Sequence, residues 1–226
     1  MKIRIATLSL TILCLALTAY AGTTTFYNDG GIDGTTGALY ISGPNQLNPS
    51  GDYQDISNGF IAAASGTPNK LQFGEWVLEG STPTSISYEL GTTVFGTDLG
   101  FGTVTQNSSN SVLLFTNADG YGIYDVTIPV TSGAMTAGTE YWVSLSNAAN
   151  TGSLQSGSWD IPDNPNGGPA TCALRVNGSF PYYCSNGGES FTLTGGQTTT
   201  PEPSSILLFG SGILGLAGVL RRKLTR

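Results

Sequence analysis

Between Gly22 and Thr200 the chain alternates short apolar runs with clusters of turn residues. The runs are rich in Thr, Val, Ile, Tyr and Phe, and Gly, Asn, Asp, Ser or Pro interrupt them every 8 to 12 residues. This spacing, with no helical periodicity in any long window, predicts an all-β domain. We expect strands at residues 23–27, 38–42, 56–63, 70–78, 84–90, 99–105, 111–116, 121–128, 140–146, 173–176 and 189–193.

Alternation within these runs predicts the side chains that share a face, because successive residues of a strand point to opposite sides. The clearest half-buried strand is 84–90, and in 140–146 the alternation favours the face that begins with Tyr141. Gly74 is expected to mark a bulge. The sets that share a face are Leu71, Phe73 and Glu75; Ile86, Tyr88 and Leu90; and Tyr141, Val143 and Leu145.

These strands fit one domain of ordinary size, which we expect at residues 22–194, followed by a polar linker at 195–200. A long Gly, Asn and Pro-rich loop is expected from Asn147 to Ala170. Many short strands with regular turns favour a two-sheet β-sandwich of jelly-roll type.

Charge narrows the range of partners. From Gly22 to Thr200 the only cations are Lys70 and Arg175, against fourteen Asp and Glu residues, so the net charge is 2 − 14 = −12. Nucleic acids and anionic membranes require Lys and Arg to displace counterions, so they are poor partners for this surface. Cations and neutral polymers are better candidates.

The first 21 residues are typical of a signal peptide. Lys2 and Arg4 precede an apolar stretch at 6–18, and Ala19 and Ala21 form a small-residue cleavage site before Gly22. Export to an oxidising compartment favours a disulfide between Cys172 and Cys184. A zinc site is the less favoured alternative, because the chain contains no histidine.

The last 26 residues have three parts in order. Pro201, Glu202 and Pro203 precede an uncharged stretch at 204–220, and a basic end that includes Arg221 and Arg222 follows. As a helix the uncharged stretch would be about 26 Å long, slightly shorter than the hydrocarbon core of a membrane. The basic end would stay in the cytoplasm, which places the rest of the chain on the other side.

This order resembles the PEP-CTERM sorting signal of Gram-negative bacteria that make extracellular polysaccharide. The resemblance covers residues 201–222, about a tenth of the chain. It implies that exosortase, a membrane-embedded cysteine protease, recognises Pro201, Glu202 and Pro203 and releases or transfers the protein. The membrane anchor would then be transient, and the protein would reach the cell surface or the medium. An ordinary C-terminal anchor that is kept is the alternative.

The composition also limits catalysis. Without histidine, a Ser-His-Asp or Cys-His catalytic set cannot be assembled. A glycosidase with two carboxylates remains an alternative. A carbohydrate-binding module is another, with Trp159 as a flat platform for sugar rings and Asp160 beside it. In the competing interpretation, Trp159 packs over a sheet edge.

Calcium is the metal that the acidic loops favour, because hard cations prefer oxygen ligands. Asp29 and Asp33 lie in one such loop, and Asp160, Asp163 and Asn164 in another. Asp, Asn and Gly are also ordinary turn residues, so we expect no cofactor and keep calcium as a weak candidate.

The leading functional hypothesis is a non-enzymatic exported protein of the cell surface or extracellular matrix, processed by exosortase and associated with exopolysaccharide or biofilm. The carbohydrate-binding module and the glycosidase are kept as alternatives. The expected partners are exosortase, extracellular polysaccharide and, before processing, the membrane.

Overall fold

The computed structural model describes residues 22–35, 37–43, 52–151, 157–161, 171–184 and 189–197, together with Gly212. Between Gly22 and Gln197 the regular secondary structure that is described consists of β-strands, which confirms the all-β prediction. They are β1 (Thr23–Asn28), β2 (Ala38–Tyr40), β3 (Gln54–Ile61), β4 (Gly66–Leu78), β5 (Pro83–Gly91), β6 (Gly100–Thr105), β7 (Ser111–Thr116), β8 (Tyr121–Pro129), β9 (Glu140–Asn150), β10 (Ser158–Asp160), β11 (Thr171–Val176), β12 (Ser179–Tyr183) and β13 (Phe191–Gln197).

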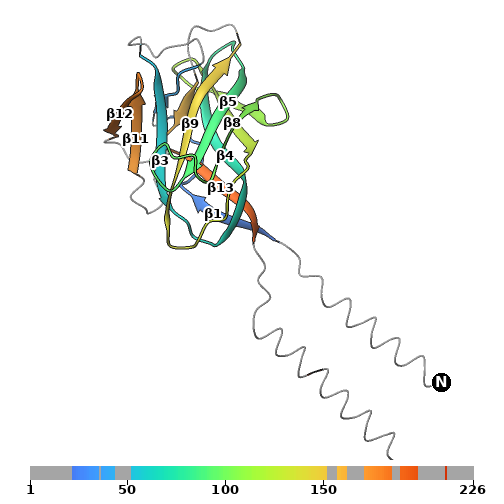
Figure 1. Cartoon of the computed structure of the whole chain (residues 1–226). Coiled ribbons are helices and arrows are strands. Elements are labelled where there is room, and N and C mark those ends of the chain that lie inside the picture. The colour runs from blue at the N-terminus through green and yellow to red at the C-terminus, as the bar shows by residue number, and fades with distance from the viewer. Residues whose placement is uncertain are drawn as a thin grey trace, which may run out of the picture.

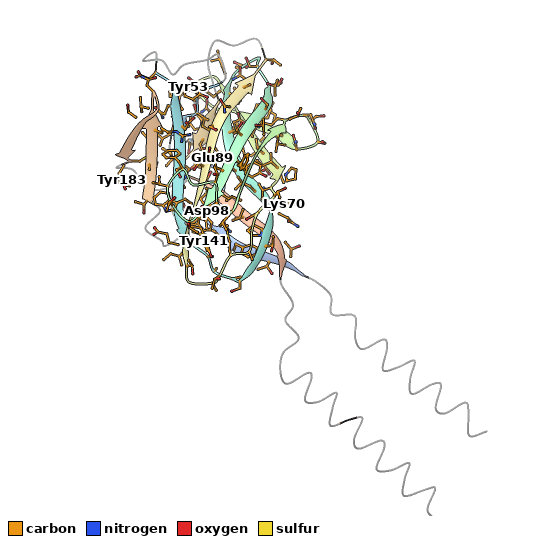
Figure 2. The ribbon with its side chains drawn as sticks, viewed as in Figure 1. Tyr53, Lys70, Glu89, Asp98, Tyr141 and Tyr183 are labelled. Carbon is orange, nitrogen blue, oxygen red and sulfur yellow. A yellow bond between two sulfur atoms is a disulfide. The ribbon has the colours of Figure 1, made fainter. Side chains whose placement is uncertain are left out.

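The strands form two sheets that pack face to face, as expected for a β-sandwich (Figure 1). The first sheet is centred on β4, which pairs with β13 and β10 on one side and with β8 on the other. β1, β2 and β7 are its edge strands. The second sheet has the order β12-β11-β3-β9-β5-β6. Tyr183 projects from the edge strand β12, and Lys70 lies in β4 (Figure 2).

The core lies between the two sheets and contains the faces that alternation predicted. Leu71 and Phe73 of β4 are buried there, as are Ile86, Tyr88 and Leu90 of β5 and Tyr141, Val143 and Leu145 of β9. Glu75 shares the core-facing side of β4 and is fully buried. The alternation therefore identified the inward faces correctly, including the one that carries a carboxyl group.

Two strands were missed by the sequence analysis. The long loop expected at 147–170 contains the end of β9 and the three-residue strand β10. β12 includes Pro181 and follows β11 after a two-residue turn. Both are too short or too irregular for alternation to be recognised. β13 also continues through Gln197, into the first residues of the expected linker.

The bulge expected at Gly74 is absent, because β4 and β8 pair in unbroken register from Lys70 to Leu78. The glycine has a different role. A Cβ atom at this position would lie 2.6 Å from Asp160 Cβ and 2.8 Å from Ile32 Cγ2. Glycine is thus needed because two other segments approach the backbone of β4 here.

The first and last strands of the domain lie side by side, since Thr23 of β1 is paired with Gly196 of β13. The predicted signal peptide with Ala19 and Ala21 lies outside the described residues, as do the sorting residues Pro201, Glu202, Pro203, Arg221 and Arg222. No helix among the described residues is long and apolar enough to cross a membrane.

Candidate functional site

Trp159 lies in the core and not on the surface. It is fully buried, its ring centre is 6.1 Å from that of Phe73 and 5.9 Å from that of Phe191, and its Nε1 donates to Ser190 O at 2.9 Å. β10 inserts between β4 and β2, so the side chain opposite Glu75 must point inward. A sugar platform needs an exposed ring. The prediction that Trp159 binds a ligand is therefore wrong.

Asp160 is also fully buried, but on the outer side of the first sheet. Its Oδ1 accepts hydrogen bonds from Trp76 Nε1 at 2.6 Å and Gly34 N at 3.1 Å. Its Oδ2 accepts from Asp33 N at 3.1 Å and Ser190 Oγ at 3.2 Å. Burial raises the pKa of Asp160, and the hydrogen bonds from Trp76, Asp33 and Ser190 oppose that shift.

Four donors occupy the four lone-pair positions of this carboxylate. Asp160 therefore has no oxygen free for a cation or a sugar, and its assignment as a ligand-binding or calcium residue is wrong. Asp163 and Asn164 lie outside the described residues. Within the part of the chain that the structure describes, no three acidic or thiol side chains are placed to hold a metal ion.

The hydrogen bonds to Asp160 hold the loop at residues 29–35 against the outer face of the first sheet. Gly34 is the closest approach: with φ at +65°, a Cβ atom there would lie 2.7 Å from both Ile123 Cγ1 and Phe115 Cζ. Both acidic loops were calcium candidates in the sequence, and the structure brings the backbone of one to the side chain of the other. Their shared role is to attach a loop to the sheet.

This loop forms one wall of a surface groove of about 520 Å³. The floor is the outer face of β13, β4 and β8, with Leu114 of β7 at the far side. Polar residues form a row across the strands, because Asn28 is paired with Thr192, Thr192 with Gln72, and Gln72 with Thr127. The groove therefore presents hydroxyl and amide groups beside apolar residues, which include Ile32 and Leu114.

Two local contacts orient the polar groups of the groove. Gln72 Nε2 donates to Asp125 Oδ1 at 2.9 Å and to Oδ2 at 3.0 Å. Asn28 Oδ1 accepts from Thr192 Oγ1 at 3.2 Å and from Gly30 N at 3.0 Å. The side chains that line the groove include one carboxylate, Asp125, and no cation. Such a groove suits a neutral, hydroxyl-rich ligand better than an ionic one.

A second groove of about 550 Å³ lies between the start of β5, the turn at 106–108 and β7. Thr84, Gln106, Ser111, Val112 and Leu113 are among its lining residues, and none of those that line it is charged. Gln106 also reaches inward, where its Nε2 donates to Glu75 Oε2 at 2.5 Å. The second groove is thus adjacent to a buried carboxyl group that it does not expose.

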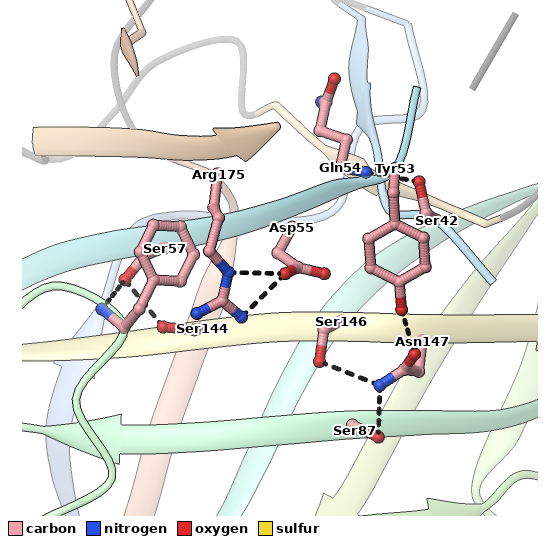
Figure 3. Close-up of polar contacts among 11 residues, drawn as sticks. Ser42, Tyr53, Gln54, Asp55, Ser57, Ser87, Ser144, Ser146, Asn147 and Arg175 are labelled. Atoms are coloured by element: carbon pink, nitrogen blue, oxygen red, sulfur yellow. Dashed lines mark hydrogen bonds and ion pairs between the residues drawn. The ribbon is translucent and has the colours of Figure 1, made fainter. Parts of the chain in front are cut away.

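The outer face of the second sheet carries a polar layer (Figure 3). Arg175 Nε donates to Asp55 Oδ2 at 2.9 Å, and the guanidinium lies 4.5 Å from the centre of the Phe95 ring. Phe95 N donates to Ser57 Oγ at 3.4 Å, so the β5–β6 loop is held over this face. Burial raises the pKa of Asp55, and Arg175 opposes the shift.

At the other end of the polar layer, Tyr53 Oη donates to Asn147 Oδ1, and Asn147 Nδ2 donates to Ser87 Oγ at 3.4 Å. Asn147 adopts a positive φ of 52°, which asparagine tolerates better than most residues. Ser144 Oγ donates to Ser57 Oγ at 2.8 Å in the middle of the layer. These groups are occupied with one another, so the layer stabilises the sheet.

Several carboxyl groups are buried without a cation. Burial raises the pKa of Glu75 to about 8 and that of Asp29 to about 6, and it raises the pKa of Glu189 well above its usual range. Asp160 and Asp29 add to the shift of Glu189 through like-charge repulsion. The nearby Tyr27 hydroxyl opposes the shift of the Asp29 pKa. Within the described region one oxygen of Glu189 has no hydrogen-bond partner, which favours its neutral form.

Cys172 and Cys184 form the predicted disulfide, with Cα atoms 5.1 Å apart. Trp76 and Trp142 are both buried by packing on the sheets. The residues predicted from the sequence do not include four that line the first groove: Asn28, Gln72, Asp125 and Thr192. Gln72 lies between the apolar residues Leu71 and Phe73, and this alternation indicated that it points outward. Only the strand pairing aligns it with Thr192 and Thr127.

The sorting tail is where a comparison with known proteins is informative. The family model of the PEP-CTERM protein-sorting motif matches residues 199–223. The match includes the Pro201-Glu202-Pro203 motif and the basic pair Arg221 and Arg222. No curated protein matches the chain. The chain therefore carries a PEP-CTERM protein-sorting motif, and this motif implies export, targeting to exosortase and a transient C-terminal membrane anchor.

Proposed function

We propose that the β-sandwich is a non-enzymatic module that exosortase processing delivers to the cell surface or to the extracellular polysaccharide matrix. One observation carries the proposal: β13 ends at Gln197, two residues before the sorting motif begins at residue 199. Cleavage at Pro201–Pro203 would leave all thirteen strands in the released product. The domain can therefore be separated from its anchor without loss of its fold.

The two grooves support a non-enzymatic role. A glycosidase needs two carboxylates on either side of the scissile bond. The first groove has only Asp125, and the second has none. The buried carboxyls, of which Glu75 is one, lie inside the fold where a glycan cannot reach them. A glycosidase would be indicated by turnover of a glycan panel that is lost when a single acidic residue is replaced.

We propose no resident cofactor. The oxygens of Asp160 that pointed to calcium are occupied by four protein donors. We expect EDTA to leave the melting temperature of the protein unchanged. A reproducible decrease of the melting temperature in EDTA that calcium reverses would contradict this.

The jelly-roll class is likewise our proposal, supported by the position of β9 between β3 and β5 and of β8 beside β4.

The intact mass of the protein recovered from the culture medium and from the membranes of its host tests the processing proposal. We expect a medium form that begins at Gly22 and ends near Pro201–Pro203. Its mass should be about 2 Da below that of the dithiol, because the disulfide removes two hydrogens. A membrane form that extends to Arg226, with no shorter product, would show instead that the tail is kept as an anchor.

Carbohydrate binding is the second candidate, and the groove at Gln72 and Asp125 favours it. Sugars are recognised by amide, carboxylate and hydroxyl groups that bond their rim, with an apolar contact to the ring face. The row from Asn28 to Thr127 provides such polar groups, and Leu114 lies beside them. This candidate replaces the site that the sequence placed at Trp159.

The test is binding of the processed protein to polysaccharide isolated from its host. Gln72→Ala and Asp125→Ala should each weaken binding about tenfold or more, because each removes hydrogen bonds at the centre of the groove. Asp119→Ala is the matched control: Asp119 is an exposed aspartate in the β7–β8 turn and does not line the groove. The candidate is rejected if the unmodified protein does not bind, or if all three variants behave alike.

A further inference from the structure

β7 is an edge strand with an unusual surface. Among the strands that the structure describes it pairs only with β8, so the hydrogen-bonding groups of its other side are unpaired within this part of the chain. Val112, Leu113, Leu114 and Phe115 follow one another along it and are 53%, 51%, 47% and 41% exposed. Four consecutive exposed apolar residues on an unpaired edge present a template for pairing with another strand.

Three of the other edge strands, β1, β2 and β12, are protected in the ways that proteins commonly use, whereas β6 is also uncharged and exposes Phe101 but is interrupted by Gly100 and Gly102. β2 has only three residues, and β1 exposes Thr23 and Thr25 on either side of its buried Thr24. β12 contains Pro181, which cannot donate a backbone hydrogen bond. β7 has an irregularity in its register with β8 between Leu113 and Phe115, but it has no charged residue, no proline and no glycine. This apolar edge is therefore a candidate interface.

Charge indicates which partner fits this edge. The region from Gly22 to Thr200 has a net charge of −12, yet no residue from Leu99 to Ala118 is charged. Two copies that meet through most of their surface would bring acidic groups together. Two copies that meet through β7 bring together strands that carry no charged side chain.

We propose that two copies of this domain associate edge to edge, with β7 of one pairing antiparallel to β7 of the other. Any pairing centred on Leu113 or Leu114 places the apolar middle of one strand against that of its neighbour. Ser111 and Thr116, the polar ends of the strand, then lie at the borders of the interface. The result is a continuous sheet across two sandwiches, with a two-fold axis near the middle of β7.

The interface is small, because one six-residue strand from each copy forms it. We therefore expect a monomer–dimer equilibrium that depends on concentration. Sedimentation velocity of the processed protein from its host, over a micromolar concentration range, should show the dimer. Leu113→Lys should weaken association about tenfold or more, because it places two like charges near the axis.

Ile61→Lys is the matched control. Ile61 is 53% exposed, a fraction similar to that of Leu113, but it lies at the end of β3 in the second sheet. The dimer should persist in this variant. Formation of the Cys172–Cys184 disulfide and an unchanged far-UV circular dichroism spectrum show that each variant folds.

Hydrogen exchange on the unmodified protein gives a readout that requires no substitution. The outward amides of β7 should become protected as the concentration rises, while those of β2 should not. A protein that remains monomeric throughout the range overturns the proposal, as does a dimer that Leu113→Lys does not weaken. Protection of β7 by a different co-purified protein would also overturn it, in favour of a foreign strand. The inference does not depend on polysaccharide binding.

Discussion

Trp76 Nε1 donates a 2.6 Å hydrogen bond to Asp160 Oδ1, although 84 positions separate the two residues. The bond joins β4 to β10 on the outer side of the first sheet. The same carboxylate accepts from Asp33 N and Gly34 N, so one buried side chain connects two strands and a loop. A charged acceptor shared by several buried donors contributes more than any one of its contacts.

Asp160→Asn should lower the free energy of unfolding by about 2–3 kcal/mol. Asparagine offers one acceptor oxygen, and its NH2 group would face donors that now bond to a carboxylate. Trp76→Phe removes only one donor and should cost about 1 kcal/mol. Urea denaturation measures both values. Asp125→Asn is the control, since this half-buried carboxylate on the same face should change stability by about 0.5 kcal/mol or less. Equal losses at Asp125 and Asp160 would contradict the assignment.

Glu75 makes stability depend on pH. Its pKa is about 8 in the folded protein, because it is fully buried, and a glutamate in an unfolded chain titrates near its ordinary value of about 4.3. Between these values the folded state holds a proton that the unfolded state has lost. Stability is therefore highest below this window and falls as pH rises through it, by about 1.4 kcal/mol per pH unit for one group. Glu189 and Asp29 shift in the same direction.

Glu75→Gln should flatten this dependence, because an amide needs no proton to be neutral. Gln106 Oε1, a buried acceptor with no partner among the described residues, would also gain a donor nearby. Denaturation between pH 5 and pH 8 measures the slope. Glu79→Gln replaces an exposed glutamate that directly follows the last residue of β4, and this variant should leave the slope unchanged. If both variants keep the slope of the unmodified protein, Glu75 is not its source.

Arg175→Ala should destabilise the protein by about 3 kcal/mol. Asp55 is almost fully buried, and the ion pair at 2.8 Å is its cationic partner, so the variant leaves a charge desolvated and unpaired. Adding Asp55→Asn removes that charge and should recover part of the loss. Thermal unfolding of the two variants and the unmodified protein measures the recovery. A double variant that is less stable than Arg175→Ala would contradict this account.

Replacing Cys172 and Cys184 together by serine should cost about 3 kcal/mol, because the bond closes a loop between residues 12 apart in the chain. The urea midpoint in the presence and absence of reductant measures this cost. Reductant should lower the midpoint of the unmodified protein and leave that of the double serine variant unchanged. A shift of equal size in both proteins would show that another effect of the reductant is responsible.

Much of the fold was predictable because each strand reports its own faces. In β5, and in β9 from Val143 to Ser146, the apolar side chains alternate with polar ones, and a period of two indicates a strand with one buried face. Cys172 and Cys184 could be paired for a different reason: they are the only cysteines between the predicted signal peptide and the sorting motif. The sorting motif was recognised because its parts are contiguous in the chain.

Residues whose surroundings come from distant segments, such as Trp159 and Gly74, could not be placed in this way. Trp159 lies among Gly, Ser, Pro and Asn, in a strand of three residues that shows no alternation. Its burial follows from its position between β4 and β2, which are distant in the chain. Gly74 looked like a bulge for the same reason, since nothing near it in sequence indicates that Asp160 and Ile32 approach it.

The sequence by itself determined the class of the fold, the inward faces of the long strands, the disulfide and the exosortase motif. These properties depend on neighbours along the chain or on a choice among very few residues. The tertiary structure alone decided that Trp159 packs in the core, that Asp160 bonds to a distant loop, and that Gln72 and Asp125 share a groove. Those properties depend on which strands lie side by side, and pairing between distant segments is set by the packing of the whole sandwich.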